Sequence, residues 1–157
     1  VRYLAADDYI SGTDIRIMKL DAPVPDCISF AKILPSNWAD YIPNNGTGLP
    51  ILFSDQEEKA VCADLYTLGE SAQIKAPTDA NRLLQYEAVV TGDSGDPIFL
   101  IINGEPILLA TFYQFYGIYP GGPSVVYYKD QINAKIASLG GGPYTMTEAD
   151  FSTYASV

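Results

Sequence analysis

The chain has 157 residues and a formal net charge of −10, with 48% hydrophobic residues, 18% charged residues and no histidine. This length suits one sizeable core or one complete small barrel. The composition indicates a soluble globular protein, and no apolar run approaches the ~20 residues of a membrane span. Because an acidic chain is repelled by nucleic acid and by anionic membranes, neither is an expected partner.

The N-terminal third of the chain predicts one strand and a long linker. Residues 1–12 are mixed, with turn chemistry at 7–8 and 11–12, and they lead into an alternating apolar strand over 15–20. Four prolines within residues 21–48 exclude a long helix, so we expect a linker between two modules.

The middle of the chain predicts three strands. Apolar runs over 49–53 and 59–68 flank the acidic segment 55–58, which we expect to be a solvated turn. Residues 71–81 are polar, and strand character resumes over 82–90.

The strongest local prediction is a hairpin with Asn103-Gly104 as its turn. Apolar residues over 98–102 and 105–115 flank this dipeptide, which matches strand twist when both residues adopt positive φ. With a closing strand over 124–128, the six or seven strands after the linker suit one closed antiparallel barrel.

The chain is expected to end in a helix and a tail. Residues 129–139 carry Ile132 and Ile136 on one helix face, and the glycines at 140–142 end the helix. The tail over 145–157 has a weak capping signal, which leaves open a short helix or a tether.

Cys27 and Cys62 are the only cysteines, too few for a disulfide scaffold and unsuited to a zinc site. Two alternatives stay open for them: a bridge if their strands meet, or two buried thiols packed as small hydrophobes. Without histidine or carboxylates at ligand spacing, no metal or other cofactor is expected.

A polar turn between two apolar runs, Thr91-Gly92-Asp93-Ser94-Gly95-Asp96-Pro97, carries the clearest chemical signal. Glycine lets the backbone bend sharply beside a serine, as an exposed nucleophile requires. The turn resembles the Gly-Asp-Ser-Gly-Gly-Pro motif of the trypsin- and chymotrypsin-like serine peptidases at five of six positions, with Asp96 in place of the second glycine. Residues 13–24 resemble the aspartate segment of the same family, in the same order along the chain.

This resemblance covers most of residues 13–139 and implies an all-β fold: the antiparallel Greek-key β-barrel that is the second barrel of the trypsin-like fold, with a C-terminal α-helix. It makes residues 1–20 the last strand of an N-terminal barrel missing from this chain, 21–48 the interdomain linker, 49–139 the C-terminal barrel and helix, and 140–157 a glycine-rich break and tail. The family also implies a peptide or protein substrate and a secreted or periplasmic location.

By the same resemblance, Ser94 is the nucleophile, Asp14 orients a histidine, and the backbone amides of Gly92 and Ser94 form the oxyanion hole. Asp93 matches an aspartate that pairs with a new N-terminal amine in activated family members, and here it is expected to be paired otherwise or solvated. Asp96 adds negative charge near Ser94. Because the chain lacks the histidine that would take the serine proton, it carries two thirds of a triad.

The family's substrate-binding positions can also be matched. Ala88 falls at the floor of the primary specificity pocket, where it offers no charge to attract Arg or Lys. The positions at which members of the family contact their substrate match Thr91, Tyr113, Gln114 and Phe115. Because Phe115 would narrow or close the pocket, the expected specificity is for small or apolar side chains, or the pocket is absent.

Two functions from different classes follow. The first is the C-terminal part of a serine endopeptidase that acts through a Ser94 acyl-enzyme and is incompetent in this chain without its histidine. The second is a non-catalytic pseudoprotease whose aromatic segment 112–119 binds a partner. A serine–lysine dyad has less support, since no lysine stands at a dyad spacing. The face left uncovered by the missing N-terminal barrel predicts self-association.

Overall fold

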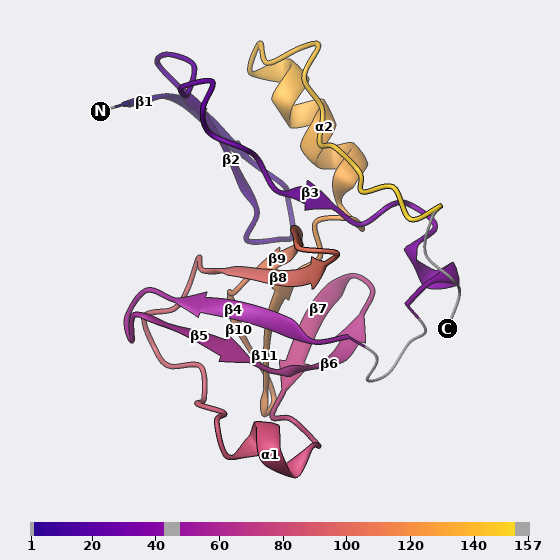
Figure 1. The fold of residues 1–157 in the computed structure, drawn as a ribbon. Coiled ribbons are helices and arrows are strands. Elements are labelled where there is room, and N and C mark those ends of the chain that lie inside the picture. Colours follow the sequence, from indigo (N-terminus) through magenta and orange to yellow (C-terminus); the bar gives the residue numbers. More distant parts are fainter. Residues whose placement is uncertain (1, 43–47, 153–157) are drawn as a thin grey trace.

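The computed structural model of the chain describes residues 2–42 and 48–152. These residues form mostly β-structure, with antiparallel sheets and a C-terminal helix (Figure 1). In chain order the elements are β1 (Leu4–Tyr9), β2 (Arg16–Leu20), β3 (Lys32–Ile33), the 3-10 helix η1 (Trp38–Asp40), β4 (Pro50–Ser54), β5 (Lys59–Cys62), β6 (Asp64–Leu68), β7 (Ser71–Lys75), α1 (Ala80–Leu83), β8 (Pro97–Ile102), β9 (Glu105–Thr111), β10 (Gln114–Tyr116), β11 (Tyr119–Pro123) and α2 (Lys129–Ser138).

Two sheets make up the body of the molecule. One has the order β3-β9-β8-β4-β5 and the other β10-β11-β7-β6. Neighbouring strands are antiparallel except β3 and β9, which run parallel. The sheets meet at two corners, because β5 continues through Ala63 into β6 and an antiparallel bridge joins Ala110 to Ser124.

The main core lies between these sheets. Side chains alternate between the two faces of a strand, so every second residue of β7 is buried. Ile74, Ile98 and Leu109 are completely buried there. Trp38 and Tyr41 pack against the same core and hold the later part of the linker, residues 21–48, to it.

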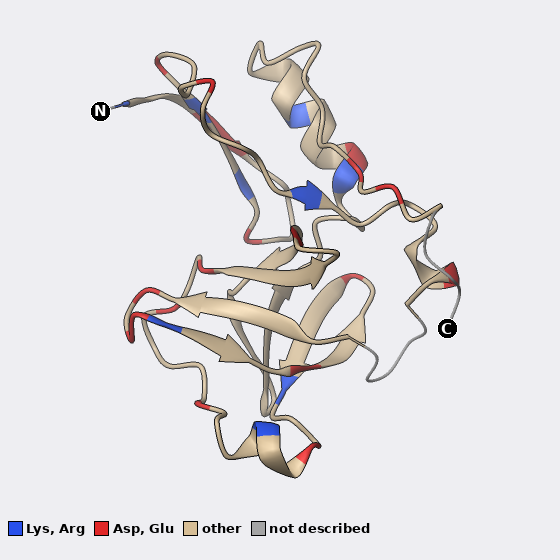
Figure 2. Ribbon diagram, viewed as in Figure 1, with Lys and Arg blue, Asp and Glu red and all other residues tan. Residues whose placement is uncertain are grey.

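A second, smaller core lies where the β1–β2 hairpin meets α2, on one side of the sheets (Figure 1). Ile10 and Ile15, at the turn of the hairpin, share it with Ile132 of α2. Lys135 of α2 also lies 2.7 Å from a carboxylate oxygen of Asp8. The hairpin is therefore attached to the body through its turn and the helix, and Figure 2 shows acidic residues on it and on several turns of the sheets.

Several predicted elements are confirmed. The strands on either side of residues 55–58 form as β4 and β5, and the helix forms over 129–138. Asn103 and Gly104 have φ of 51° and 80° and join β8 to β9. Both residues adopt the positive φ that a two-residue hairpin turn requires.

The strand predicted over 82–90 is wrong. The short helix α1 occupies its start, because the Asp79 carboxylate accepts a hydrogen bond from the Arg82 amide and caps the helix. The Arg82 side chain then reaches Asp64, with a nitrogen–oxygen distance of 2.6 Å. Leu83 and Leu84 are 49% and 81% exposed, so of the apolar residues that suggested a strand only Val89 is buried in the main core, with Tyr86 packed against it.

The strand predicted over 124–128 is also wrong, because the pairing strand is β11, over 119–123. A Cβ atom on Gly122 would lie 1.8 Å from the carbonyl oxygen of Thr111, and one on Gly121 would lie 2.3 Å from that of Ala72. These glycines allow close approach to the neighbouring backbone. The polar segment starting at residue 71 likewise forms a strand, β7.

The N-terminal segment and the tail hold more structure than expected. Asp7 and Asp8 lie within β1, whereas the turn predicted at 11–12 is present. The tail is neither helical nor a free tether over its described part, since Ile33 of β3 exchanges hydrogen bonds with Thr147 and Ala149. Residues 43–47 of the linker and 153–157 of the tail lie outside the described residues.

Cys27 and Cys62 are both free and exposed, so neither a bridge nor a pair of buried thiols describes them. Among the described helices, none has the length and apolar character needed to cross a membrane.

Candidate functional site

The segment around Ser94 consists of two consecutive tight turns. The amide of Asp93 donates to the Val90 carbonyl at 3.3 Å, and the amide of Asp96 donates to the Asp93 carbonyl at 3.0 Å. Gly92 and Gly95 have φ of 114° and 101°, which an L-residue rarely adopts. Ser94 is exposed between these two glycines.

Asp93 fixes the turn from inside the protein. Its side chain is completely buried, and its two carboxylate oxygens accept hydrogen bonds from the Ser54 hydroxyl at 2.6 Å and the Val90 amide at 2.9 Å. A buried carboxylate needs such partners, because an unpaired charge in the interior costs several kcal/mol. Of the two alternatives predicted for Asp93, pairing is therefore present.

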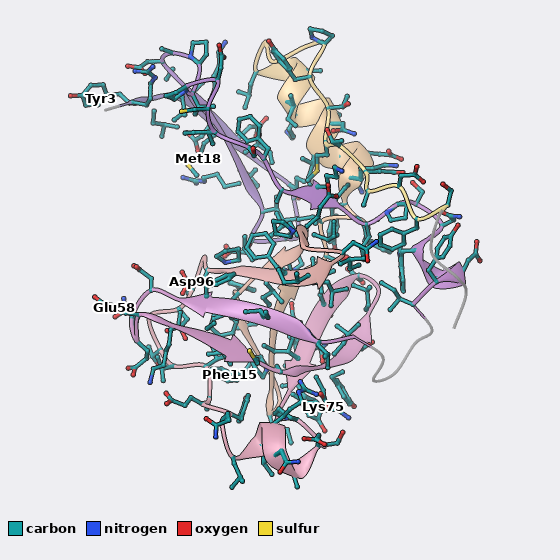
Figure 3. The ribbon with its side chains drawn as sticks, in the orientation of Figure 1. Tyr3, Met18, Glu58, Lys75, Asp96 and Phe115 are labelled. Atoms are coloured by element: carbon teal, nitrogen blue, oxygen red, sulfur yellow. The ribbon has the colours of Figure 1, made fainter. Side chains whose placement is uncertain are left out.

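The turn between β4 and β5 supports the serine turn from one side. Asp55 donates its backbone amide to a carboxylate oxygen of Asp96 at 2.9 Å, so Asp96 holds the two turns together (Figure 3). Gln56 packs against Gly92, where an added Cβ would lie 2.5 Å from the Gln56 Cγ. The acidic segment 55–58 is exposed, as predicted, but it also braces the site.

The end of β9 supports the serine turn from the other side. Gly95 donates to the carbonyl of Phe112 at 2.7 Å, and Phe112 donates to the carbonyl of Asp96 at 2.7 Å. Phe112 is buried and packs edge-on against Phe115, with 5.6 Å between ring centroids.

Backbone amides on both sides of Asp93 are left as donors. Within the described residues, neither the Gly92 nor the Ser94 amide has an acceptor, and the Ser94 hydroxyl has no hydrogen-bond partner. Both residues are exposed. The turn therefore offers unpaired N–H groups on either side of a buried anchor, an arrangement that can stabilise a negatively charged oxygen.

Asp14 lies in the turn of the β1–β2 hairpin. Thr13 makes the side-chain hydrogen bonds of this turn, with the Ile10 carbonyl at 2.8 Å and the Ile15 amide at 3.0 Å. The Asp14 carboxylate is exposed and has no ion pair or hydrogen bond with another described residue. It lines a cavity that also includes Tyr113.

The structure brings some predicted substrate-binding residues together. Tyr113 and Gln114 line the same cavity as Asp14, and Phe115 is exposed on β10. Ala88 and Thr91 are exposed and lie outside that cavity. Since Phe112 bonds to Gly95 and is followed directly by Tyr113, the end of β9 links the serine turn to the cavity.

Sequence reasoning missed the contribution of Ser54, Asp55 and Gln56. These residues precede the serine by about 40 positions, and nothing in their local pattern distinguishes them from any polar turn. The only available signal was Asp93 itself, since a buried aspartate requires hydrogen-bond donors. Comparison with protein-family models and with curated proteins finds no match for this chain.

Proposed function

We propose that this chain is the second barrel of a trypsin-like serine peptidase, with Greek-key connections. The continuity of β5 and β6 and the bridge between Ala110 and Ser124 support closure of the two sheets into one barrel. The C-terminal helix, the linker and the position of the serine turn before the β8–β9 hairpin support the same assignment.

In this proposal Ser94 hydrolyses peptide bonds through an acyl-enzyme. Its Oγ attacks the scissile carbonyl carbon, a base takes the hydroxyl proton, and the leaving amine receives that proton as the peptide bond breaks. A water molecule then releases the acyl group by the same route. The unpaired amides of Gly92 and Ser94 carry the proposal, because they can donate to the oxygen on which negative charge develops.

The base must come from outside this sequence, which contains no histidine. Asp14 has an exposed carboxylate without a partner among the described residues, and it would orient and stabilise an imidazole supplied by another segment. The chain alone is therefore incompetent. A secreted or periplasmic location belongs to this same proposal.

Hydrolysis of an unstructured protein such as casein tests the proposed activity. The chain joined to the sequence that precedes it in its gene should cut casein, and Ser94→Ala should reduce the rate to background. Gly92→Val should reduce the rate about a hundredfold by disturbing one oxyanion donor. Ser152→Ala, an exposed serine in the tail, is the matched control and should leave the rate unchanged. Equal rates for Ser94→Ala and the parent would contradict the proposal.

The alternative function is that of a pseudoprotease that binds peptides without cutting them. The absence of histidine and the exposure of Tyr113 and Phe115, at 41% and 47%, favour it. Phe115→Ala should then weaken peptide binding about tenfold, while Ile118→Ala, on the exposed β10–β11 turn, should not. Cleavage by the extended chain would exclude this alternative.

The hairpin supplies the proposed interaction surface. Its exposed apolar side chains would pack against the missing N-terminal barrel or, in this chain alone, against a second copy. Tyr3 and Met18, which project from the hairpin in Figure 3, are 68% and 62% exposed. Exposed apolar surface of this kind marks protein interfaces.

A further inference from the structure

A cavity of about 500 Å³ lies between the turn of the β1–β2 hairpin, the β6–β7 turn and β10. Its wall includes two carboxylates and three tyrosines, namely Asp14, Glu70, Tyr113, Tyr116 and Tyr128. The β6–β7 turn and β10 belong to the same four-stranded sheet, so the hairpin and this sheet meet at one concave surface that is polar and apolar in about equal parts.

The charge of this cavity is entirely negative. Neither carboxylate forms an ion pair with another described residue, and no lysine or arginine lines the cavity. Four other cavities of the molecule differ in this respect, because each has a basic residue in its wall: Lys59, Lys75, Arg82 and Lys32. An anionic ligand would be repelled from the cavity, whereas a cation would find charge that the protein leaves uncompensated.

Glu70 is held in place by the cavity wall. The hydroxyl of the buried Tyr128 donates to its Oε1 at 2.9 Å, which leaves Oε2 without a hydrogen-bond partner among the described residues. Burial and the hydrogen bond to Glu70 raise the pKa of Tyr128 to about 12, so its hydroxyl remains a donor at neutral pH. Oε1 of Glu70 is thereby held in place, and Oε2 is available to bind a ligand.

The tyrosines favour the same class of ligand. A tyrosine ring attracts a cation through its face, and its hydroxyl oxygen accepts hydrogen bonds from ammonium or guanidinium groups. Tyr113 and Tyr116 can therefore attract a cation whether the ring face or the hydroxyl group of each is turned toward the cavity. Gln114 adds an amide oxygen that can accept a further hydrogen bond.

We propose that this cavity binds an organic cation, a guanidinium or primary ammonium group, between the carboxylates of Asp14 and Glu70. The site shares Asp14, Tyr113 and Gln114 with the proposed peptidase site, so the inference names a ligand class for part of that surface. Because the binding requires neither a covalent step nor Ser94, it can hold even where the proposed catalysis fails. Such a group is offered by an arginine or lysine side chain of a peptide or by a free amine.

Titration calorimetry with two probes tests this site. N-acetylarginine methylamide presents the cation as a peptide side chain, and agmatine presents it as a free amine. The citrulline analogue of the first probe is its neutral comparator. The arginine probe should bind at least about tenfold more tightly than citrulline, with affinity that falls as salt is added. Tighter binding of agmatine would assign the site to free amines, and tighter binding of the arginine probe to peptides.

Variants locate the binding. Glu70→Gln and Asp14→Asn together should weaken it about tenfold. The glutamine oxygen can still accept from Tyr128, and circular dichroism checks that the variant is folded. Asp26→Asn, an exposed aspartate outside the cavity, is the matched charge control and should change little. Ser94→Ala should bind normally, which would show that the binding is independent of the proposed nucleophile. Equal affinity for arginine and citrulline, or unchanged affinity in the folded double variant, would overturn the proposal.

Discussion

The hydroxyl of Ser54 lies 2.6 Å from a carboxylate oxygen of Asp93, and both side chains are buried. Ser54 ends β4, and Asp93 precedes the candidate nucleophile. Ser54 also accepts a hydrogen bond from the Glu57 amide at 3.1 Å, so it connects the β4–β5 turn to the serine turn. The conformation of the candidate site is therefore set by a residue of a neighbouring strand.

Ser54→Ala should lower the free energy of unfolding by about 2 kcal/mol, because it removes a hydrogen bond to a buried charge. Urea denaturation measures the change. Ser29→Ala, at an exposed position in the linker, is the control and should change it by less than about 0.5 kcal/mol. Equal stability of the two variants would show that the Ser54–Asp93 contact contributes little.

Asp64 should make stability depend on pH. Burial raises its pKa, but hydrogen bonds from the Thr78 amide, Arg82 and the Thr78 hydroxyl outweigh that effect, so the pKa lies below its ordinary value. In the unfolded chain an aspartate titrates near ~3.9. The stabilising contribution is therefore complete above that value and is lost as the pH falls through the lower pKa of the folded state.

Asp64→Asn tests this pH dependence. It should lower the free energy of unfolding by about 2 kcal/mol at pH 7, since it weakens contacts made by a buried charge. The difference from the parent should shrink as the pH falls below about 4. Asp26→Asn should show almost no difference at either pH. A difference for Asp64→Asn that is the same at pH 7 and pH 3 would contradict the assignment.

Gly122 should tolerate no side chain. Gly122→Ala places a Cβ against the backbone oxygen of Thr111, which cannot move without disturbing β9, and it should cost at least about 3 kcal/mol. Gly69→Ala is the matched control, because its Cβ would meet nothing within 4 Å. Thermal denaturation compares the two, and a stable Gly122→Ala protein would contradict the packing of β11 against β9.

Prediction from sequence succeeded where the structural signal was local. Asn103-Gly104 carries its own turn preference, and Ile132 marks the inward face of α2. It failed where the reason for a conformation lies elsewhere in the chain. Gly122 lies in a strand that approaches the backbone of Thr111 too closely for any side chain. Arg82 lies in a helix, and its side chain forms an ion pair with Asp64.

The candidate site likewise has features that local sequence predicts and contacts that it does not. The exposed serine between two glycines was predictable from composition, because glycine permits the positive φ that such a turn needs. The contact of Asp93 with Ser54 spans 39 residues, and the cavity shared by Asp14 and Tyr113 joins segments even further apart. Local patterns carry no information on pairings of that kind.

The exposed hairpin face should cause self-association of this chain. Leu4 and Met18 are 55% and 62% exposed, and burying them against a second copy would remove apolar surface from water. Sedimentation velocity at micromolar concentration should show dimers or larger species. Leu4→Lys with Met18→Lys should shift the protein to monomer, whereas Ile118→Lys, on another surface, should not. A monodisperse monomer for the unaltered chain would contradict this expectation.

The central claim is that Ser94 is a nucleophile that lacks only a base from outside this sequence. A fluorophosphonate probe, which labels activated serines, tests it most directly on this chain and on the chain joined to the sequence that precedes it in its gene. We predict labelling of the extended form alone, lost in Ser94→Ala and retained in Ser152→Ala. Absence of labelling in both forms would contradict the claim and favour a non-catalytic binding protein.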